Sequence, residues 1–353
     1  MRQGIGDLRR VFRRAVGAAL AAALGGALLA GCGSSPTAAK PKVTVVIGYE
    51  NNGADPEMVA IARGFFAQYM PGARVALRYF SSGPAALAAL ASGSLQFMTG
   101  IGNPPTAAAI GQGVPLKVIW AQEQYTTDEG LVVRKGSGIA QLKDLEHQNL
   151  ALVVGSTSPF EVATAMAQQG IPQGSIHFVN MSPPAMVAAW ERGQIDAAYV
   201  WDPAFDTMLQ HGGQAIMYDR TVQSAAPIFN LALVQAPWAK AHRALVLGFI
   251  EAEQAGVEYA KAHPQQAVRQ MAKEAGITTA LAQTELQGYR ILDAQAQVGQ
   301  GGLGSGSGVA SSLVTVSLAS SAAYLASIQQ IPAAPAQMAS YVDPSYVQAV
   351  LGR

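Results

Sequence analysis

Short apolar runs rich in β-branched residues alternate with helical patterns over the first two thirds of this chain, and this alternation limits the possible folds most. Val43–Tyr49 is predicted as a buried strand, and Pro56–Tyr69 follows as an amphipathic helix that begins with proline. Further strands are predicted over Leu95–Met98, Leu116–Trp120, Leu131–Arg134, Leu150–Val154, Ile176–Val179, Ala197–Val200 and Phe229–Val234. Such alternation predicts an α/β fold with mainly parallel sheets that helices cover.

Helical patterns fill the intervals between these strands and then dominate the rest of the chain. The intervening helices are predicted over Pro84–Ala91, Phe160–Gln169, Pro184–Arg192 and Pro203–Gln210. From Ala236 onward the sequence predicts helices alone, over Pro237–Ala262, Pro264–Gly276, Thr278–Ile291 and Ser311–Gln329. The glycine- and serine-rich segment Gly301–Gly308 is expected to form a loop within this helical tail.

The N-terminus has the order of a secretory signal. A segment with five arginines precedes an apolar run over Ala15–Ala30, which is shorter than the roughly 20 residues of a membrane span. The next residues complete the motif Leu29-Ala30-Gly31-Cys32, which resembles the lipobox of bacterial lipoproteins, whose cysteine is acylated. An ordinary cleaved signal with a chance cysteine is the alternative, and the twin arginines leave the export route open between Sec and Tat.

These residues divide the N-terminal region into a signal peptide and a tether. Residues 1–31 are expected to be removed, and residues 32–41 are polar, contain proline and show no periodicity, as in a flexible linker. The protein is therefore expected to be exported and lipid-anchored to the cell envelope through Cys32, in the periplasm or on the outer face of the cell membrane.

The remaining composition excludes several classes of function. Five of the 23 basic residues and one of the 22 acidic residues lie in the first 31 positions, so the rest carries 18 basic against 21 acidic residues. That balance does not favour nucleic-acid binding, which needs a clustered basic face. Cys32 is the sole cysteine and the five histidines are scattered, so we expect no disulfide, no metal site and no cofactor.

Four segments together resemble the solute-binding proteins of sulfonate ABC importers, most closely those for taurine. The order and spacing of the segments, rather than any one motif, carry the resemblance, which runs from about Val43 to Val234. The segments are Tyr79-Phe-Ser-Ser-Gly-Pro-Ala-Ala-Leu-Ala-Ala-Leu-Ala-Ser-Gly-Ser-Leu-Gln-Phe97, Gly100-Ile-Gly-Asn-Pro-Pro-Thr106, Gly155-Ser-Thr-Ser-Pro159, and the run from Pro183 to Pro203 that ends in Tyr-Val-Trp-Asp-Pro.

The resemblance implies the two-lobed clamshell of type II periplasmic binding proteins with a helical C-terminal extension. The chain would cross between lobes near Glu129–Arg134 and return near Ala225–Val234. Lobe 1 would then comprise residues 42–130 and 225–353, and lobe 2 residues 131–224. The function implied is capture of a small sulfonate such as taurine by a monomer, and its delivery to an ABC permease and its ATPase, without catalysis.

Three loops have the composition of an anion site. A sulfonate is a permanent anion, and backbone N–H groups at helix N-termini bind such groups well. Each loop joins a strand end to a proline-started helix through small polar residues, which could also serve only as helix caps. The presence of three such loops favours one shared ligand. The residues expected to contact it are Ser82, Gly83, Gly102, Asn103, Ser156, Thr157 and Ser158.

An ammonium group on the ligand would need an aromatic wall and a carboxylate, and Trp201 and Asp202 offer both at one strand end. The alternatives are core packing for Trp201 and a helix N-cap for Asp202. Glu50 and Glu129 are also predicted at strand ends facing the cleft. Either could pair with an ammonium group or lie solvated at the rim.

One position departs from the taurine pattern. Taurine-binding relatives carry an aspartate in the return strand, where this chain has Asn230. An amide accepts a hydrogen bond from an ammonium group but cannot neutralise its charge. An alkanesulfonate, nitrate or a thiamin-pyrimidine precursor therefore remains a competing ligand for the Asn230 site.

Two other functional classes remain as alternatives. An enzyme of the thiamin-pyrimidine synthase type shares the architecture, but its resemblance involves an iron-binding cysteine cluster that this chain lacks. A structural or adhesive lipoprotein would not need three anion-binding loops.

Overall fold

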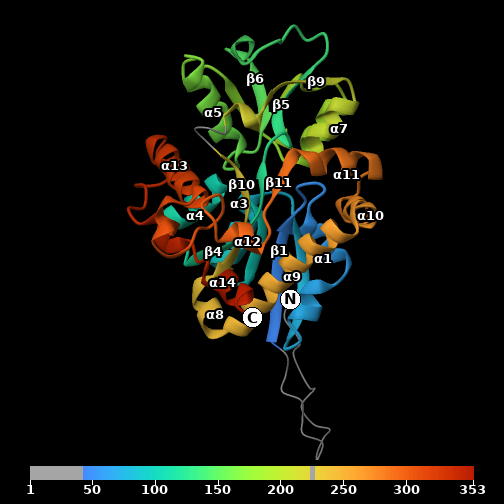
Figure 1. Cartoon of the computed structure of the whole chain (residues 1–353). Helices are drawn as coiled ribbons and strands as arrows, with labels where there is room; N and C mark the ends of the chain where they lie inside the picture. Colours follow the sequence, from blue (N-terminus) through green and yellow to red (C-terminus); the bar gives the residue numbers. More distant parts are fainter. Residues whose placement is uncertain (1–42, 223–226) are drawn as a thin grey trace, which may run out of the picture. The chain divides into compact units, whose positions relative to one another are not determined.

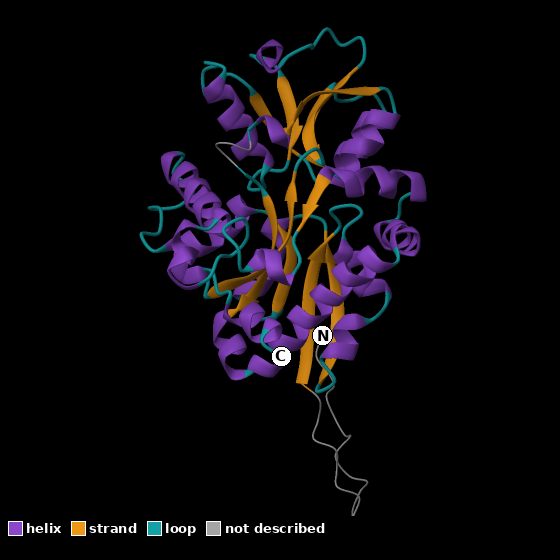
Figure 2. Cartoon of the chain, viewed as in Figure 1, coloured by secondary structure: helices purple, strands orange, loops and turns teal. Residues whose placement is uncertain are grey.

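The computed structural model describes residues 43–222 and 227–353, which contain two β-sheets flanked by helices (Figure 1, Figure 2). The first sheet has the strand order β11-β4-β10-β3-β1-β2 and the second has the order β7-β6-β8-β5-β9. The strands of the first sheet are β1 (Val43–Glu50), β2 (Ala73–Phe80), β3 (Phe97–Ile101), β4 (Leu116–Tyr125), β10 (Phe229–Gln235) and β11 (Tyr289–Ile291). Those of the second are β5 (Glu129–Arg134), β6 (Asn149–Leu152), β7 (His177–Asn180), β8 (Ala197–Trp201) and β9 (Gly213–Tyr218).

The helices follow the strands in the expected alternation and then form the C-terminal region. The first group is α1 (Pro56–Ala62), α2 (Phe65–Tyr69), α3 (Gly83–Ala91), α4 (Asn103–Gly111), α5 (Ser158–Gln168), α6 (Pro183–Glu191) and α7 (Ala204–Gln210). The second group is α8 (Ala236–Ala241), α9 (Arg243–Ala262), α10 (Pro264–Ala275), α11 (Thr279–Glu285), α12 (Ala294–Gln297), α13 (Leu313–Ser327) and α14 (Ser345–Leu351). The architecture is therefore α/β with C-terminal helices, as predicted.

The prediction of mainly parallel sheets is wrong, because both sheets are mixed. Strands β1, β2 and β3 pair in parallel, as do β6, β7 and β8. Strand β10 is antiparallel to β3 and β4, and β5 is antiparallel to β8 and β9. Each sheet thus combines a parallel half with antiparallel strands, and the antiparallel strands β4, β5 and β10 lie where the chain passes between sheets.

The passages between the sheets lie close to the predicted crossings. The chain leaves the first sheet at Tyr125 and enters the second at Glu129, just before the predicted crossing. It returns between β9 and β10, an interval that includes residues 223–226, which lie outside the described residues. The assignment of whole lobes at residues 130 and 225 remains a prediction.

Two predicted helices are each broken in the structure. The helix expected over Pro56–Tyr69 ends at Ala62, because Gly64 adopts a left-handed conformation (φ 68°) and α2 begins after it. The helix expected over Pro237–Ala262 is divided at His242, which caps both α8 and α9. Helical periodicity continues through both breaks, so it did not reveal them.

The expectation that no strand follows Ala236 is wrong. The helix predicted over Thr278–Ile291 stops at Glu285, and β11 then pairs with the edge of β4. Gly288 adds two bonds to this junction, because its carbonyl accepts the N–H groups of Thr126 and Thr127. The predicted loop Gly301–Gly308 leads into a short 3-10 helix over Gly306–Ser311.

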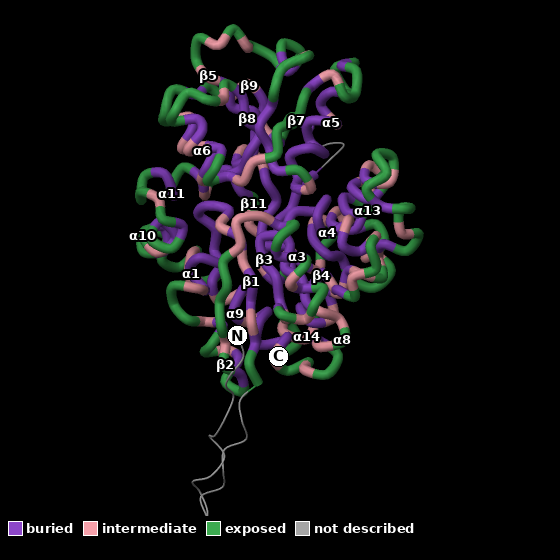
Figure 3. The backbone as a smooth tube through the Cα atoms, turned by 180° about the vertical axis from the view of Figure 1, so that it is seen from behind, coloured by how far each residue is buried: buried purple, intermediate pink, exposed green. Residues whose placement is uncertain are grey.

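Each sheet has its own hydrophobic core (Figure 3). In the first, Phe97 stacks on Phe249 of α9 with ring centroids 4.3 Å apart. Helix α9 approaches its neighbours closely through two glycines: a Cβ on Gly248 would lie 2.2 Å from the Tyr69 carbonyl oxygen, and one on Gly256 would lie 2.6 Å from that of Pro56. Burial of α9 against α1 and α2 therefore depends on small residues at these two positions.

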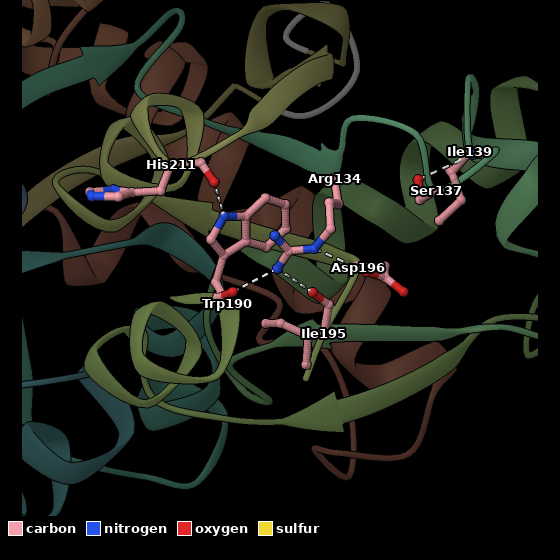
Figure 4. A network of polar contacts seen from close by, with 7 residues as sticks. All are labelled: Arg134, Ser137, Ile139, Trp190, Ile195, Asp196 and His211. Atoms are coloured by element: carbon pink, nitrogen blue, oxygen red, sulfur yellow. Dashed lines mark hydrogen bonds and ion pairs between the residues drawn. The ribbon is translucent and has the colours of Figure 1, made fainter. Parts of the chain in front are cut away.

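An arginine holds the end of β5 in the second sheet (Figure 4). The Arg134 guanidinium donates to the carbonyl oxygens of Trp190 (2.6 Å) and Ile195 (3.1 Å) and pairs with Asp196 at 3.1 Å. It also lies over the Trp190 ring, whose indole N–H donates to the His211 carbonyl oxygen at 3.0 Å. This network connects β5, α6 and the end of α7.

No helix among the described residues has both the length and the apolarity needed to cross a bilayer. The predicted signal peptide (residues 1–31) and tether (residues 32–41), including Cys32, lie outside the described residues.

Candidate ligand-binding site

Two adjoining cavities lie between residues of the two sheets, and Glu50 and Trp201 line both. The larger, called the outer cavity, has an empty volume of about 530 Å³ and the smaller, called the inner cavity, one of about 270 Å³, and both volumes include space open to solvent. The other outer-cavity residues are Asn51, Tyr79, Phe80, Ser81, Pro183, Pro184, Val187, Asp202, Pro203, Ala204 and Thr207. The other inner-cavity residues are Asn52, Gly83, Gly100, Gly102, Pro105, Tyr125, Ser156, Thr157 and Asn230.

Three helices begin at the inner cavity, as the loop sequences predict. Helix α3 starts at Gly83, α4 follows Gly102, and α5 follows Thr157; all three of these residues line the cavity. None of the three N-cap residues makes a side-chain capping bond to its helix. The N–H groups of a helix's first turn sit at the positive end of the dipole and mostly lack intrahelical partners. The prolines in these first turns have no N–H, and the Ser158 N–H already bonds Ser156 Oγ, so the free donors come mainly from α3 and α4. The inner cavity is therefore suited to an anionic group.

Two hydroxyl groups at the start of α5 bind a buried carboxylate, and a third, on Ser156, accepts the Ser158 N–H. Thr157 Oγ1 donates to Glu129 at 2.7 and 2.8 Å, and Ser158 Oγ donates to it at 2.7 Å. Burial raises the pKa of Glu129 to about 7, although these two hydroxyl bonds act in the opposite direction. Glu129 thus fixes the loop from behind the cavity wall.

Glu50 is the acidic group common to both cavities. It is 5 % exposed, and burial together with the charge of Glu129 raises its pKa well above the usual value. No lysine or arginine is among the described residues that line either cavity. An anionic ligand would therefore depend on N–H and hydroxyl donors, and a cationic group beside Glu50 would relieve the cost of burying its charge.

Asn230 lies in the inner cavity wall with its amide turned toward a second carboxylate. Its Nδ2 donates to Glu123 and, at 3.0 Å, to the Tyr125 hydroxyl. Glu123 is fully buried, and burial raises its pKa well above the usual value. Position 230 thus lacks a carboxyl group, but Glu123 places one directly behind Asn230. The taurine pattern did not indicate Glu123.

Four predicted contact residues do not line either cavity. Asn103 is fully buried, and its side chain is occupied by its neighbours: Oδ1 accepts the N–H of Phe229 in β10 at 2.8 Å, and Nδ2 donates to the Pro227 carbonyl at 2.9 Å and to Ser317 Oγ. Glu129 and Ser158 bind each other behind the wall, and Ser82 serves as the N-cap position of α3.

The other eight predicted residues all line a cavity. Trp201 and Asp202 end β8 with exposed fractions of 6 % and 2 %, and Asp202 Oδ1 accepts the Asp206 N–H at 3.0 Å. Asp202 therefore acts as a cap and also lines the outer cavity. The complete set is Glu50, Gly83, Gly102, Ser156, Thr157, Trp201, Asp202 and Asn230.

Several cavity residues were not predicted from the sequence. Tyr79 is half exposed in the outer cavity, opposite Pro183 and Pro184 at the start of α6. Tyr79, Pro183 and Pro184 belong to the segments that carried the family resemblance, so the motif indicated their neighbourhood but not their side chains. Asn52 in the inner cavity donates to the Gly100 carbonyl at 3.0 Å and had no motif to mark it.

The loops of the two sheets touch across the inner cavity. A Cβ on Gly102, after β3, would lie 2.4 Å from Thr157 Cγ2, before α5. Thr157 has a stiff, branched side chain whose hydroxyl is held by Glu129, so it has little room to move. Only glycine at position 102 permits this approach.

Comparison with known proteins agrees with this geometry. The taurine-binding periplasmic protein of Escherichia coli is 35 % identical over 207 residues, which are 59 % of this chain and 63 % of that protein. The alkanesulfonate-binding protein SsuA of Xanthomonas axonopodis, solved with MOPS, has a TM-score of 0.71 at 19 % identity and covers 85 % of this chain and 98 % of its own.

The same fold also occurs in a desulfurization enzyme, DszB, with a TM-score of 0.61 at 13 % identity over 88 % of this chain and 99 % of that one. The structural matches establish the type II periplasmic-binding-protein fold. The family model described as "NMT1/THI5 like" matches residues 51–267. The chain belongs to the NMT1/THI5-like family.

Proposed function

We propose that this protein is an extracytoplasmic solute-binding protein that captures a small sulfonate, such as taurine, for an ABC importer. The observation that carries the proposal is the meeting of three helix N-termini at the inner cavity, where none of the N-cap residues makes a side-chain capping bond. These N–H groups suit the oxygens of a sulfonate, which stays ionised at every physiological pH. The E. coli relative that binds taurine supports the same ligand class.

The rest of the cleft favours a ligand with a cationic end. Glu50 lies in both cavities, Asp202 lies in the outer one, and Trp201 provides an aromatic surface beside them. A zwitterion places its anion at the helix N-termini and its ammonium group near these carboxylates. Glu123 behind Asn230 provides a carboxyl group near the position where the sequence alone predicts none. We therefore favour an amine-bearing sulfonate over an alkanesulfonate or nitrate.

Binding without catalysis fits the residues of the cleft. Neither cavity contains a histidine or cysteine among its described lining residues, and the Thr157 hydroxyl there is bonded to Glu129. The role of the protein would be to close on its ligand and present the closed form to a permease. Export and anchoring through lipidated Cys32 would keep this monomeric domain close to the permease.

Calorimetric titration of the purified protein with taurine, an alkanesulfonate, sulfate and nitrate tests the proposal. We expect taurine to bind well below 1 mM, which corresponds to about −4 kcal/mol, and to bind more tightly than the other three. Absence of binding by both sulfonates would contradict the function.

The variant Asn230→Asp tests the position that departs from the taurine pattern. A carboxylate there should raise the ratio of taurine affinity to alkanesulfonate affinity by about tenfold, because it adds a charge that only the amine can use. An unchanged ratio would remove Asn230 from the amine-binding part of the site.

A further inference from the structure

A group of carboxylates lies where α7 meets α11. One of them, Asp202, also lines the outer cavity. Asp202, Asp206 and Glu285 each offer one oxygen, and these oxygens lie within 4.8 Å of one another. Asp202 follows β8 of the second sheet and Asp206 lies in α7, whereas Glu285 ends α11 in the C-terminal region. The group, called the acidic triad below, thus joins elements far apart in the sequence, and Figure 1 shows α7 next to α11.

The acidic triad has no basic partner in the described part of the chain. The ion pairs there are Arg134–Asp196, Lys261–Asp293 and Arg353–Glu251, none of which involves it. Asp202 and Glu285 are 2 % and 1 % exposed, so water screens their mutual repulsion only weakly. Buried carboxyl groups at this spacing must either hold protons or share a positive partner.

One buried oxygen of the triad and one of a neighbouring carboxyl group lack hydrogen-bond partners among the described residues. Glu285 Oε2 accepts the Ala54 N–H at 2.9 Å, but Glu285 Oε1 has no partner among the described residues. The same holds for Oδ2 of Asp128, a residue that is 1 % exposed. Asp128 lies beside the triad, because its carbonyl accepts the Asp202 N–H at 2.9 Å and its carboxyl group interacts with that of Asp202.

A glycine keeps the space between two members of the triad open. Gly53 has φ 91°, and a Cβ there would lie 2.6 Å from Glu285 Oε2 and 3.2 Å from the Asp202 Cβ. A side chain at position 53 would therefore push Glu285 away from Asp202.

We propose that Asp202, Asp206 and Glu285 bind a divalent cation, with Ca²⁺ as the best match. The donors are all oxygens, which suit hard cations, and no histidine or cysteine is present to favour Zn²⁺. Ca²⁺ accepts six to eight oxygen ligands in flexible geometry, whereas Mg²⁺ demands a near-ideal octahedron. Water completes the coordination through the partly exposed side of Asp206.

The bound cation would connect the ligand cleft to the C-terminal helices. Asp202 belongs to the triad and also lines the outer cavity. A cation there holds α7 against α11 and fixes the strand end that carries Trp201. This site adds to the proposed sulfonate binding and does not depend on it.

Thermal unfolding of the metal-free protein, prepared with EDTA and then dialysed, tests the site. We expect 1 mM CaCl₂ to raise the Tm by at least about 3 °C, with a smaller rise for MgCl₂. Glu285→Gln and the partly exposed Asp206→Asn should each abolish the rise, and the exposed Glu258→Gln on α9 should keep it. Circular dichroism establishes that each variant is folded.

Three results would overturn the proposal: no rise in the unsubstituted protein, an equal rise in Glu285→Gln and Asp206→Asn, or a rise with ZnCl₂ alone. Taurine titrations in EDTA separate the two claims, since sulfonate binding there leaves the proposed function intact whatever CaCl₂ does.

Discussion

Single residues determine how closely the loops around the inner cavity can approach one another. Gly102 and Thr157 meet there from different sheets, and the space between them excludes even a methyl group. Asn103, the next residue, shows how residue type alone misleads. It lies in a loop with the composition of an anion site, yet its amide group bonds to the backbone of Phe229 in β10 and of Pro227 just before it.

The variant Gly102→Ala is expected to weaken ligand binding by at least about tenfold, or roughly 1.4 kcal/mol, because the added methyl group holds the loops apart. Gly72→Ala is the matched control, since a Cβ there meets only Leu245 Cδ2 at 4.0 Å. Calorimetric titration with taurine measures the affinity of each variant. Equal affinities for the two variants would show that the approach of Gly102 to Thr157 does not matter for binding.

At the scale of elements, the sequence predicted the existence of most strands and helices but not their pairing. The motifs placed α3, α4 and α5 correctly, because proline and small polar residues mark helix starts. Strand β11 was not predicted, because three residues carry no periodicity and gain their strand character only from pairing with β4. The antiparallel orientation of β5 and β10 likewise depends on tertiary contacts.

Arg134 offers a test of how elements of the second sheet are joined. Arg134→Lys should lower the free energy of unfolding by about 1 to 2 kcal/mol, because a lysine cannot keep two carbonyl bonds, the Asp196 pair and the ring contact together. Arg192→Lys is the control, since that exposed arginine bonds only Gln194 among the described contacts. Urea unfolding measures the stability of both variants. Indistinguishable midpoints would contradict the role of Arg134 in joining these elements.

Helix α9 provides a second test at the same scale. Gly→Ala inside a helix ordinarily stabilises by about 1 kcal/mol, but a methyl group on Gly256 would press on the Pro56 carbonyl. We expect Gly256→Ala to destabilise the protein by about 1 to 3 kcal/mol, as overpacking does. A rise in the unfolding midpoint would mean that α1 and α9 can separate at no cost.

Across residues 43–222 and 227–353, buried carboxyl groups outnumber the basic groups that pair with them. Glu57 illustrates this: it is 2 % exposed, and burial followed by the charge of Asp55 raises its pKa to about 8. Glu123 and Glu253 also face it, and Gln122 donates to it at 2.8 Å. No motif marks these residues, because burial of a carboxylate is a property of the folded chain.

Stability should therefore fall as the pH rises. Between the unfolded pKa of 4.5 and about 8, folded Glu57 keeps a proton that the unfolded chain releases, so each pH unit costs about 1.4 kcal/mol from this group. Glu57→Gln should reduce the slope of Tm against pH from 5 to 8.5, and the exposed Glu258→Gln should not. Stability that increases with pH over this range would contradict the buried, protonated state.

A sulfonate is expected to lie at the N-termini of α3, α4 and α5, and a crystal structure of the protein with taurine is the decisive measurement. We expect sulfonate oxygens within hydrogen-bond distance of first-turn N–H groups at these helix N-termini, and the ammonium group toward Glu50 and Trp201. A sulfonate bound outside the inner cavity, or one oriented with its ammonium group toward the helix N-termini, would show that the inner cavity is not the anion site.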